Sequence, residues 1–217
     1  MKKLHSMTLL LGLAAVAGPA SAADTGWYAG VDLGSSNYAQ MKPSADQVTQ
    51  DLAQQGIATT NSVSDTATAY GLDVGYQFLR YFAVEGGYVD LGSVSADINA
   101  TAVPVTEHVE IHAKGETLYA VGILPLSDNF SLFGKLGALV YTQDFKGSVS
   151  ATGLPTTDLP HSSDSGTTPA IGVGADWNIN DRFGLRLGFT RFHAVGDAND
   201  TGKGTIDLSY LQFLVHF

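Results

Sequence analysis

The sequence predicts an all-β fold, a closed antiparallel up-and-down transmembrane β-barrel of about eight strands. Three observations lead to this prediction. Apolar residues alternate with small or polar residues in eight segments, the connections between these segments are alternately short and long, and charged residues make up only 15% of the chain. Alternation with a period of two is typical of strands, whose side chains point to opposite faces of a sheet.

The first 22 residues have the composition of a secretory signal peptide. Lys2 and Lys3 give a basic start, an apolar run covers residues 7–16, and the segment ends in small residues at Ala20 and Ala22. The apolar run is too short for a membrane helix, which needs about 20 residues. We therefore expect residues 1–22 to be removed on export and residues 23–217 to form one barrel domain.

The charge and the amino-acid composition exclude several classes of protein. The net charge is −10, and it becomes −12 when Lys2 and Lys3 are removed with the signal peptide. An acidic chain is unsuited to binding a phosphate backbone, so no nucleic acid is expected as a partner. The absence of cysteine excludes disulfides, cysteine catalysis and zinc sites made of thiolates. We expect no cofactor and no metal.

The predicted strands follow one another along the whole mature chain. In residues 26–38, Trp27, Val31 and Leu33 share one face, while Gly30 and Asp32 share the other. Residues 66–78 repeat this pattern, and the remaining predicted strands cover residues 82–91, 116–125, 130–141, 168–177, 183–192 and 205–217. Short connections are expected near residues 79–81, 127–129 and 178–182, and long polar loops over 38–65, 93–114, 146–167 and 194–204. This alternation is typical of an up-and-down barrel.

The apolar face is expected to point outward, toward lipid. It carries bulky aromatic and aliphatic side chains, whereas the opposite face carries glycine, alanine and charged residues that fit a narrow interior better. Because lipid does not tolerate an open sheet edge, the barrel should be closed. Aromatic residues near strand ends are expected to form interfacial girdles: Trp27, Phe78, Tyr81, Tyr141, Trp177 and Phe217. A soluble periplasmic barrel that binds a ligand is the alternative.

The last strand places Leu211, Phe213, Val215 and Phe217 on the lipid-facing side. It must pair with the first strand to close the ring. A terminal aromatic in this pattern resembles the C-terminal signature that the assembly machinery of bacterial outer-membrane proteins reads. An ordinary edge strand that ends on phenylalanine is the simpler alternative.

Four segments together resemble the outer-membrane protein A (OmpA)-like transmembrane β-barrel family: "WYAGVDLGSSNY", "FAVEGGYVDLG", "LPLSDNFSLFGKLGALVY" and "VGDAND". The resemblance covers nearly all of residues 23–217 and implies a multi-pass barrel in the outer membrane of a Gram-negative bacterium. Full-length members also carry a C-terminal module that binds peptidoglycan. This chain ends with its last predicted strand, so no cell-wall tether is expected.

Charged residues lie on the small-residue faces of the strands, and the resemblance gives them a role. Glu85, Lys135, Asp176 and Arg186 match positions where the family carries interior ion pairs, and Asp73 falls on the same face as these residues. A buried charge without a partner costs several kcal/mol, so we expect a network of ion pairs inside the barrel. The network is either a gate that opens when pairs exchange or a polar core that only fills space, and the polar core is favoured.

Two positions depart from the family pattern. Val121 and Gly188 stand where the family carries a lysine and a glutamate. We expect a thinner network, with more room for water, at these two positions.

These features predict a structural or surface-interaction role through long extracellular loops, with at most weak pore activity. A narrow porin-like channel for small solutes is the alternative, and a lipid A-modifying enzyme is less favoured; we expect no catalysis. His108, Glu110 and His112 resemble metal ligands, but a polar surface loop is the simpler interpretation. Expected partners are outer-membrane lipid and lipopolysaccharide, the barrel assembly machinery, periplasmic chaperones, and surface ligands of a host or a phage.

Overall fold

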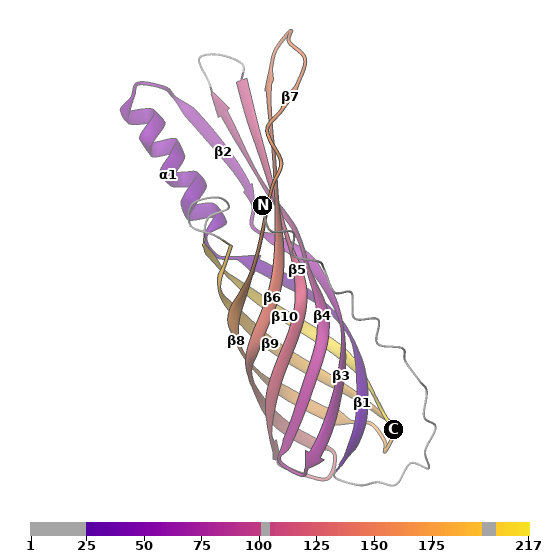
Figure 1. Cartoon of the computed structure of the whole chain (residues 1–217). Helices are drawn as coiled ribbons and strands as arrows, with labels where there is room; N and C mark the ends of the chain where they lie inside the picture. The colour runs from indigo at the N-terminus through magenta and orange to yellow at the C-terminus, as the bar shows by residue number, and fades with distance from the viewer. Residues whose placement is uncertain (1–24, 101–104, 197–202) are drawn as a thin grey trace.

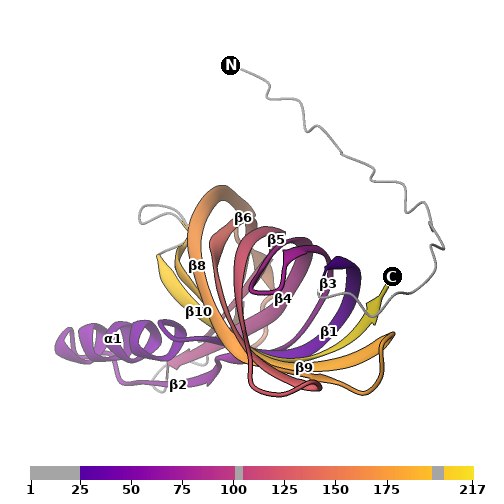
Figure 2. The same ribbon diagram turned by 90° about the horizontal axis from the view of Figure 1, so that it is seen from below.

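The computed structural model describes residues 25–100, 105–196 and 203–217. In this part of the chain, eight antiparallel strands form a closed ring (Figures 1 and 2). The ring consists of β1 (Gly26–Tyr38), β3 (Thr66–Leu79), β4 (Phe82–Ala100), β5 (Val105–Pro125), β6 (Phe130–Ala151), β8 (Ser162–Asn178), β9 (Phe183–Val195) and β10 (Gly204–His216). Each strand pairs with the next, and β10 pairs with β1. The predicted closed barrel is confirmed. The expected signal peptide lies outside the described residues.

The two ends of the barrel differ. Short connections at residues 80–81, 126–129 and 179–182 join strands at one end, which we call the turn end, and Phe217 lies there too. In the last of these turns, the Asn180 side chain accepts hydrogen bonds from the backbone N–H groups of Arg182 and Phe183, both at 2.9 Å. Such local bonds hold a tight turn between two antiparallel strands.

At the other end, the extended end, the sheet continues well beyond the ring. β4, β5 and β6 extend there, β2 (Thr59–Ser64) pairs with β4, and the two-residue β7 (Thr157–Asp158) pairs with β6 (Figure 1). The long loops predicted over residues 93–114 and 146–167 are therefore wrong, since most of those residues belong to strands. Alternation persists there through Val94, Ala96 and Ile111, but the many polar residues between them obscured it in the sequence.

The loop predicted over residues 38–65 contains the helix α1 (Met41–Gln54) together with β2. Met41 and Ala45 are the buried residues of α1, four positions apart and therefore on one face of the helix. The helix ends before Gly56, whose φ of +81° is the left-handed conformation that terminates many helices. Among the described residues, no helix is both long and apolar enough to cross a membrane.

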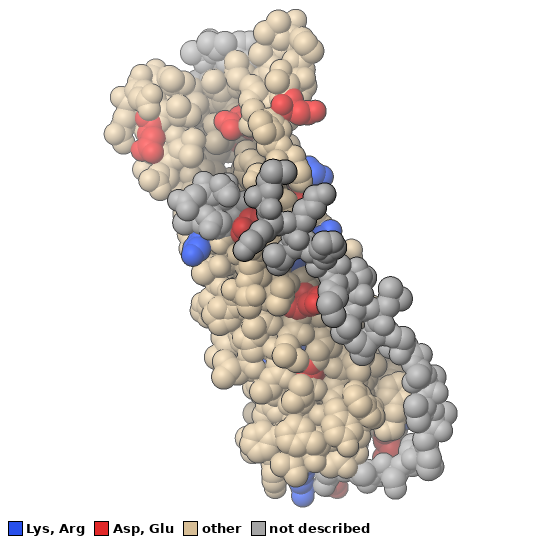
Figure 3. All heavy atoms as spheres, viewed as in Figure 1, with Lys and Arg blue, Asp and Glu red and all other residues tan. Residues whose placement is uncertain are grey.

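Large apolar side chains cover the outside of the ring. Leu33, Leu118, Leu136 and Leu187 are each more than 60% exposed, and they come from four different strands. The remaining members of this belt include Val31, Leu72, Ile171, Val173, Leu211 and Phe213. The barrel surface is mostly uncharged in Figure 3, whereas acidic side chains are visible at the extended end. A continuous apolar surface of this kind is suited to lipid and not to water.

Candidate functional site

The centre of the barrel interior holds the charged residues, and Glu85 of β4 is their hub. Its carboxylate is fully buried. Lys135 Nζ lies 2.6 Å from one carboxylate oxygen, and Arg186 binds the other oxygen. The Tyr28 hydroxyl donates a hydrogen bond to the same carboxylate at 2.7 Å. One buried acid is thus held by two cations and a phenol from three other strands.

Arg186 of β9 links Glu85 to a second acid. Its guanidinium donates two hydrogen bonds to the Asp176 carboxylate, at 2.6 and 3.0 Å. Asp176 lies directly opposite Arg186 in the β8–β9 register, so the sheet itself aligns this pair. The guanidinium also lies 4.4 Å from the centre of the Phe133 ring, a distance that favours a cation–π contact.

Lys135 is enclosed by aromatic rings. Its ammonium lies 5.2 to 5.5 Å from the ring centres of Tyr119, Phe133 and Tyr210. These rings exclude water from the ion pair with Glu85 and contribute cation–π attraction of their own. The six charged residues that the sequence placed on the inner faces, namely Asp32, Asp73, Glu85, Lys135, Asp176 and Arg186, are all buried in the structure.

Asp73 takes part in a different contact. The side-chain amide of Gln212, which is fully buried on β10, donates a hydrogen bond to the Asp73 carboxylate at 2.9 Å. Gln212 was not identified from the sequence. Its position on the inner face of the last strand was the available signal. A polar residue is tolerated there only when it has a hydrogen-bond partner.

The interior also contains aromatic rings, and one of them, Tyr141, was predicted to lie outside. Five of these rings each lie directly opposite a glycine on the neighbouring strand and cover it: Tyr28 faces Gly75, Tyr119 faces Gly137, Phe133 faces Gly174, Tyr141 faces Gly166 and Tyr210 faces Gly188. A β-carbon at any of these glycines would overlap the facing ring or come within about 2.7 Å of it. The aromatic–glycine pair is therefore the unit that lets bulky rings fit into a narrow barrel.

The family-pattern departures at Val121 and Gly188 are explained by the same packing. Val121 is fully buried, and the Tyr210 ring occupies the space beside Gly188. These positions are thus filled by apolar and aromatic groups, and the extra room for water expected there is not seen.

Of the predicted interfacial aromatics, Trp27, Tyr81 and Trp177 are more than half exposed on the outer surface. Tyr141 differs, because it is only 6% exposed and lies on the inner face of β6. Its placement in an interfacial girdle is wrong. The Tyr141 hydroxyl donates to Asp164 at 3.3 Å, and the alternation of β6 puts Tyr141 on the same side as Lys135.

Two cavities lie on opposite sides of this packed centre. One, about 410 Å³, opens at the turn end and reaches Arg186, Asp176 and His216. The other, about 300 Å³, lies at the extended end and reaches Tyr38 and Gln143. They share none of the described residues that line them. The ion pairs and the rings therefore separate the two ends of the barrel.

The histidines that resemble metal ligands lie on β5, not in a loop. His108 contacts Asp97 at 2.7 Å and His112 contacts Asp90 at 2.8 Å, both across the β4–β5 pairing. Each histidine thus meets a carboxylate of its own. Within residues 25–100, 105–196 and 203–217, no group of three or more potential ligands is positioned to hold a metal ion.

Comparisons with known proteins agree with this architecture. Residues 22–215 match the family described as the OmpA-like transmembrane domain. Outer membrane protein A of Salmonella typhi is 30% identical over 218 residues, which cover 97% of this chain and 55% of that protein. The corresponding protein of Serratia marcescens is 29% identical over 206 residues, 93% of this chain and 52% of that protein. The chain thus spans about half the length of these curated relatives.

Among solved structures, the N-terminal β-barrel domain of Pseudomonas aeruginosa OprF is similar, with a TM-score of 0.47 and 12% identity over 89% of this chain and 99% of that chain. The family match, which covers nearly the whole chain, is the stronger finding. The chain therefore belongs to the OmpA-like transmembrane domain family, whose members are non-enzymatic, multi-pass β-barrels of the Gram-negative outer membrane.

Proposed function

We propose that this protein is a plugged barrel that presents an extended sheet at the cell surface for contact with host cells, phage or neighbouring surface molecules. The observation that carries the proposal is the closed interior, in which Glu85 is held by Lys135, Arg186 and Tyr28. A protein built mainly to conduct solutes would leave this space open.

The energetics of the interior support a barrel that stays closed. Opening a path means separating Glu85 from at least one of its two cations. Leaving one member of a buried ion pair unpaired costs roughly 3–5 kcal/mol, so an open state is rarely populated. Aromatic rings packed against glycines fill the remaining space, and this packing would persist even if the ion pairs were broken.

The extended end supplies the surface for contact. In barrels of this kind, short turns face the periplasm and longer segments face the outside. By this orientation we expect the extended sheet formed by β2, β7 and the outer parts of β4, β5 and β6 (Figure 1), together with α1, to face the outside of the cell. Paired strands present side chains in fixed positions, so this surface is more rigid than a set of free loops. Lipopolysaccharide surrounds it and is a further expected contact.

Conductance in planar bilayers tests the closed interior. The unmodified protein should show only small, intermittent currents. Glu85→Ala should raise the fraction of time that the channel is open, because it removes the hub that holds both cations. Asp158→Ala, a change in the exposed β7, should leave the currents unchanged. A steady conductance in the unmodified protein would contradict the plug.

A narrow channel for small solutes is the second candidate, and the 410 Å³ cavity at the turn end favours it. This cavity brings solvent as far as Arg186 and Asp176, so that one rearrangement of the ion pairs would complete a path. Uptake of small solutes by liposomes that contain the protein distinguishes the two functions. The channel predicts rapid uptake by the unmodified protein, whereas the plugged barrel predicts little uptake by the unmodified protein and an increase with Glu85→Ala.

The surface role is tested by adhesion. Bacteria that display the protein should bind epithelial cells or adsorb phage better than bacteria that display a variant with residues 152–160 replaced by a short Gly-Ser turn. Both proteins should reach the outer membrane in equal amounts, since the replaced segment lies beyond the ring. Equal adhesion and equal adsorption by the two strains would contradict a role for this tip.

A further inference from the structure

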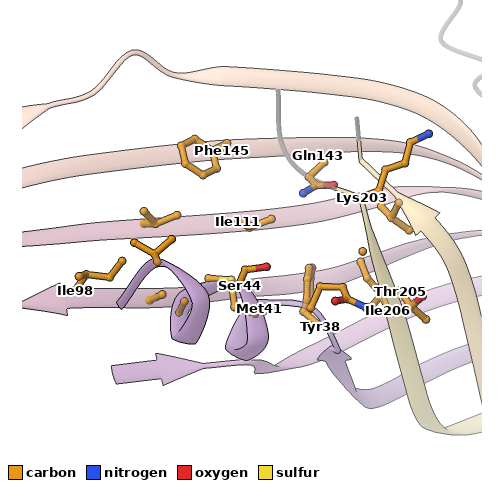
Figure 4. Close-up of a pocket in the computed structure, with 17 residues that line it drawn as sticks. Tyr38, Met41, Ser44, Ile98, Ile111, Gln143, Phe145, Lys203, Thr205 and Ile206 are labelled. Carbon is orange, nitrogen blue, oxygen red and sulfur yellow. The ribbon is translucent and has the colours of Figure 1, made fainter. Parts of the chain in front are cut away.

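The cavity at the extended end is lined mainly by apolar side chains, although it lies beyond the apolar belt of the ring. It lies between α1 and the inner faces of β4, β5 and β6, beside the start of β10. Figure 4 shows Met41 and Ser44 of α1 on one side and Phe145 of β6 on the other. Four aliphatic side chains complete the apolar wall: Val48, Ile98, Val109 and Ile111.

The cavity exists because small residues keep α1 and the sheet from filling it. Ala45 and Ala96 both line it, and both are buried. Val48, on the same face of α1, remains 42% exposed although it borders an apolar space. An apolar wall that stays open to water is unfavourable, and a ligand that covers it would gain that burial energy.

The two ends of the cavity differ in polarity. In Figure 4, Lys203, Gln143 and Thr205 gather toward one side, whereas Ile98 and Phe145 lie toward the other. The register agrees, because Gln143 is opposite Ala113, and Phe145 is opposite Ile111, farther from the ring. Among the described residues that line the cavity, Lys203 carries the only charge.

We propose that this cavity binds a medium-chain monocarboxylate, with its alkyl tail between α1 and the strands β4 to β6 and its carboxylate beside Lys203. The volume of about 300 Å³ is at the lower end of the roughly 300–1,000 Å³ typical of small-molecule pockets. At about 30 Å³ for a water-sized group, this volume holds a ligand of roughly ten heavy atoms. The ten carbons of decanoate match this limit, and its two carboxylate oxygens would lie at the polar end of the cavity beside Lys203.

The cavity lies above the ring, so the ligand would come from the external medium and not from the lipid around the barrel. It shares none of its described lining residues with the ion pairs of the interior or with the cavity at the turn end. Ligand binding and barrel conductance can therefore be tested separately, and failure of one does not imply failure of the other.

Equilibrium dialysis of radiolabelled decanoate against the folded protein in lipid nanodiscs tests the proposal, with empty nanodiscs as the measure of lipid partitioning. Saturable binding above the empty discs is expected. Val48→Asp should abolish it, since a carboxylate in the apolar wall opposes an alkyl tail. Lys203→Ala should weaken decanoate binding roughly tenfold but leave decanol binding unchanged, because only the acid uses the ammonium. Lys146→Ala is the matched control, because Lys146 is exposed on β6 and does not line the cavity.

Heat-modifiable mobility on gels confirms that each variant is folded before binding is measured. Decanoate binding no greater than in empty discs would overturn the proposal. Binding that survives Val48→Asp would place the ligand elsewhere and would also overturn it. Equal decanoate affinity in the unmodified protein and Lys203→Ala would overturn the assignment of the carboxylate to Lys203.

Discussion

The backbone N–H of Phe217 donates a hydrogen bond to the carbonyl oxygen of Trp27 at 2.9 Å. The last residue of the sequence is thus hydrogen-bonded to the second residue of β1, at the turn end of the barrel. Its side chain points outward and is 57% exposed, whereas His216 lies on the inner side and contacts the Tyr28 ring at 5.9 Å between ring centres. The two neighbouring residues therefore point to opposite sides of the strand, Phe217 to the outer surface and His216 to the lumen.

Replacing Phe217 with Asp, or deleting it, should reduce outer-membrane insertion of the 217-residue chain far more than His216→Asn. A charge near the membrane interface costs only about 0–1 kcal/mol. A large loss would therefore mean that the assembly machinery recognises the terminal aromatic, as we propose, together with Leu211, Phe213 and Val215. Heat-modifiable protein in outer-membrane fractions is the measurement. Insertion of the Phe217 variants at the unmodified level would show that no such recognition occurs.

The folded barrel should resist SDS at room temperature and unfold on boiling, with a change in gel mobility. Closure leaves no free strand edge in the ring. Unfolding by detergent therefore has no unpaired backbone groups from which to start. Gel electrophoresis of samples kept cold or boiled checks this. A single mobility under both conditions, in protein already shown to be folded, is the result that closure does not allow.

Lys135→Ala should destabilise the barrel far more than Lys146→Ala. Lys135 is buried against Glu85, and removing it leaves a carboxylate unpaired, at roughly 3–5 kcal/mol. Lys146 is exposed on the outer part of β6, where an ion pair contributes about 0–1 kcal/mol. Urea midpoints in detergent micelles measure the difference. Equal midpoints for the two variants would show that the buried ion pair of Lys135 does not stabilise the barrel.

Gly137→Ala should destabilise the barrel by about 1–3 kcal/mol, as overpacking of a filled interior does. A β-carbon at Gly137 would overlap the Leu118 carbonyl and crowd the Tyr119 ring. Gly134→Ala, three residues earlier on β6, is the matched control, because its β-carbon would point outward with its nearest neighbour 4.0 Å away. Urea unfolding separates the two variants. If both unfold at the same midpoint, the aromatic–glycine pairs do not constrain the interior.

Helix α1 should loosen at acidic pH. The Asn61 side chain donates to Asp46 at 2.9 Å, and this bond, assisted by Lys42, holds the pKa of Asp46 below its ordinary value. A lowered pKa in the folded state stabilises the docked helix at neutral pH, and that stabilisation is lost as the pH falls below about 3.9. A spin label at Gln47 should become more mobile over this range.

Asn61→Ala should remove this pH dependence and make the label mobile at neutral pH as well. Ser62→Ala, on the opposite and exposed face of β2, should behave like the unmodified protein. If the mobility of the label changes neither with pH nor on Asn61→Ala, another contact holds α1 in place.

The ring itself was predictable because two-residue alternation is strong wherever one face of a strand meets lipid. Beyond the ring both faces are partly polar, so the sequence predicts loops where the structure has β2 and the outer parts of β4, β5 and β6. Tyr141 shows a second limit, because its bulk favoured the outside although its even spacing from Lys135 along β6 places it on the inner face. Its partner Gly166 lies far along the sequence, and the pair becomes visible only once the register is known.

The interior charges were located by resemblance and alternation together, and Gln212 was missed because the resemblance gave no reason to single it out. The cavity beside α1 had no signal in the sequence. It depends on how a helix of modest apolar character docks against a sheet, and residues from α1, β4, β5, β6 and β10 meet there only in three dimensions.

Because β1 and β10 are neighbours in the ring but opposite ends of the chain, the barrel cannot close while it is being synthesised. Ala29 finds its partner Val215 only after the whole sequence has been made. Until then both terminal strands keep an unpaired edge, and long-range pairing of this kind is slow and exposed to aggregation. We therefore expect periplasmic chaperones to be its first partners, because they can cover two unpaired strand edges before the barrel closes.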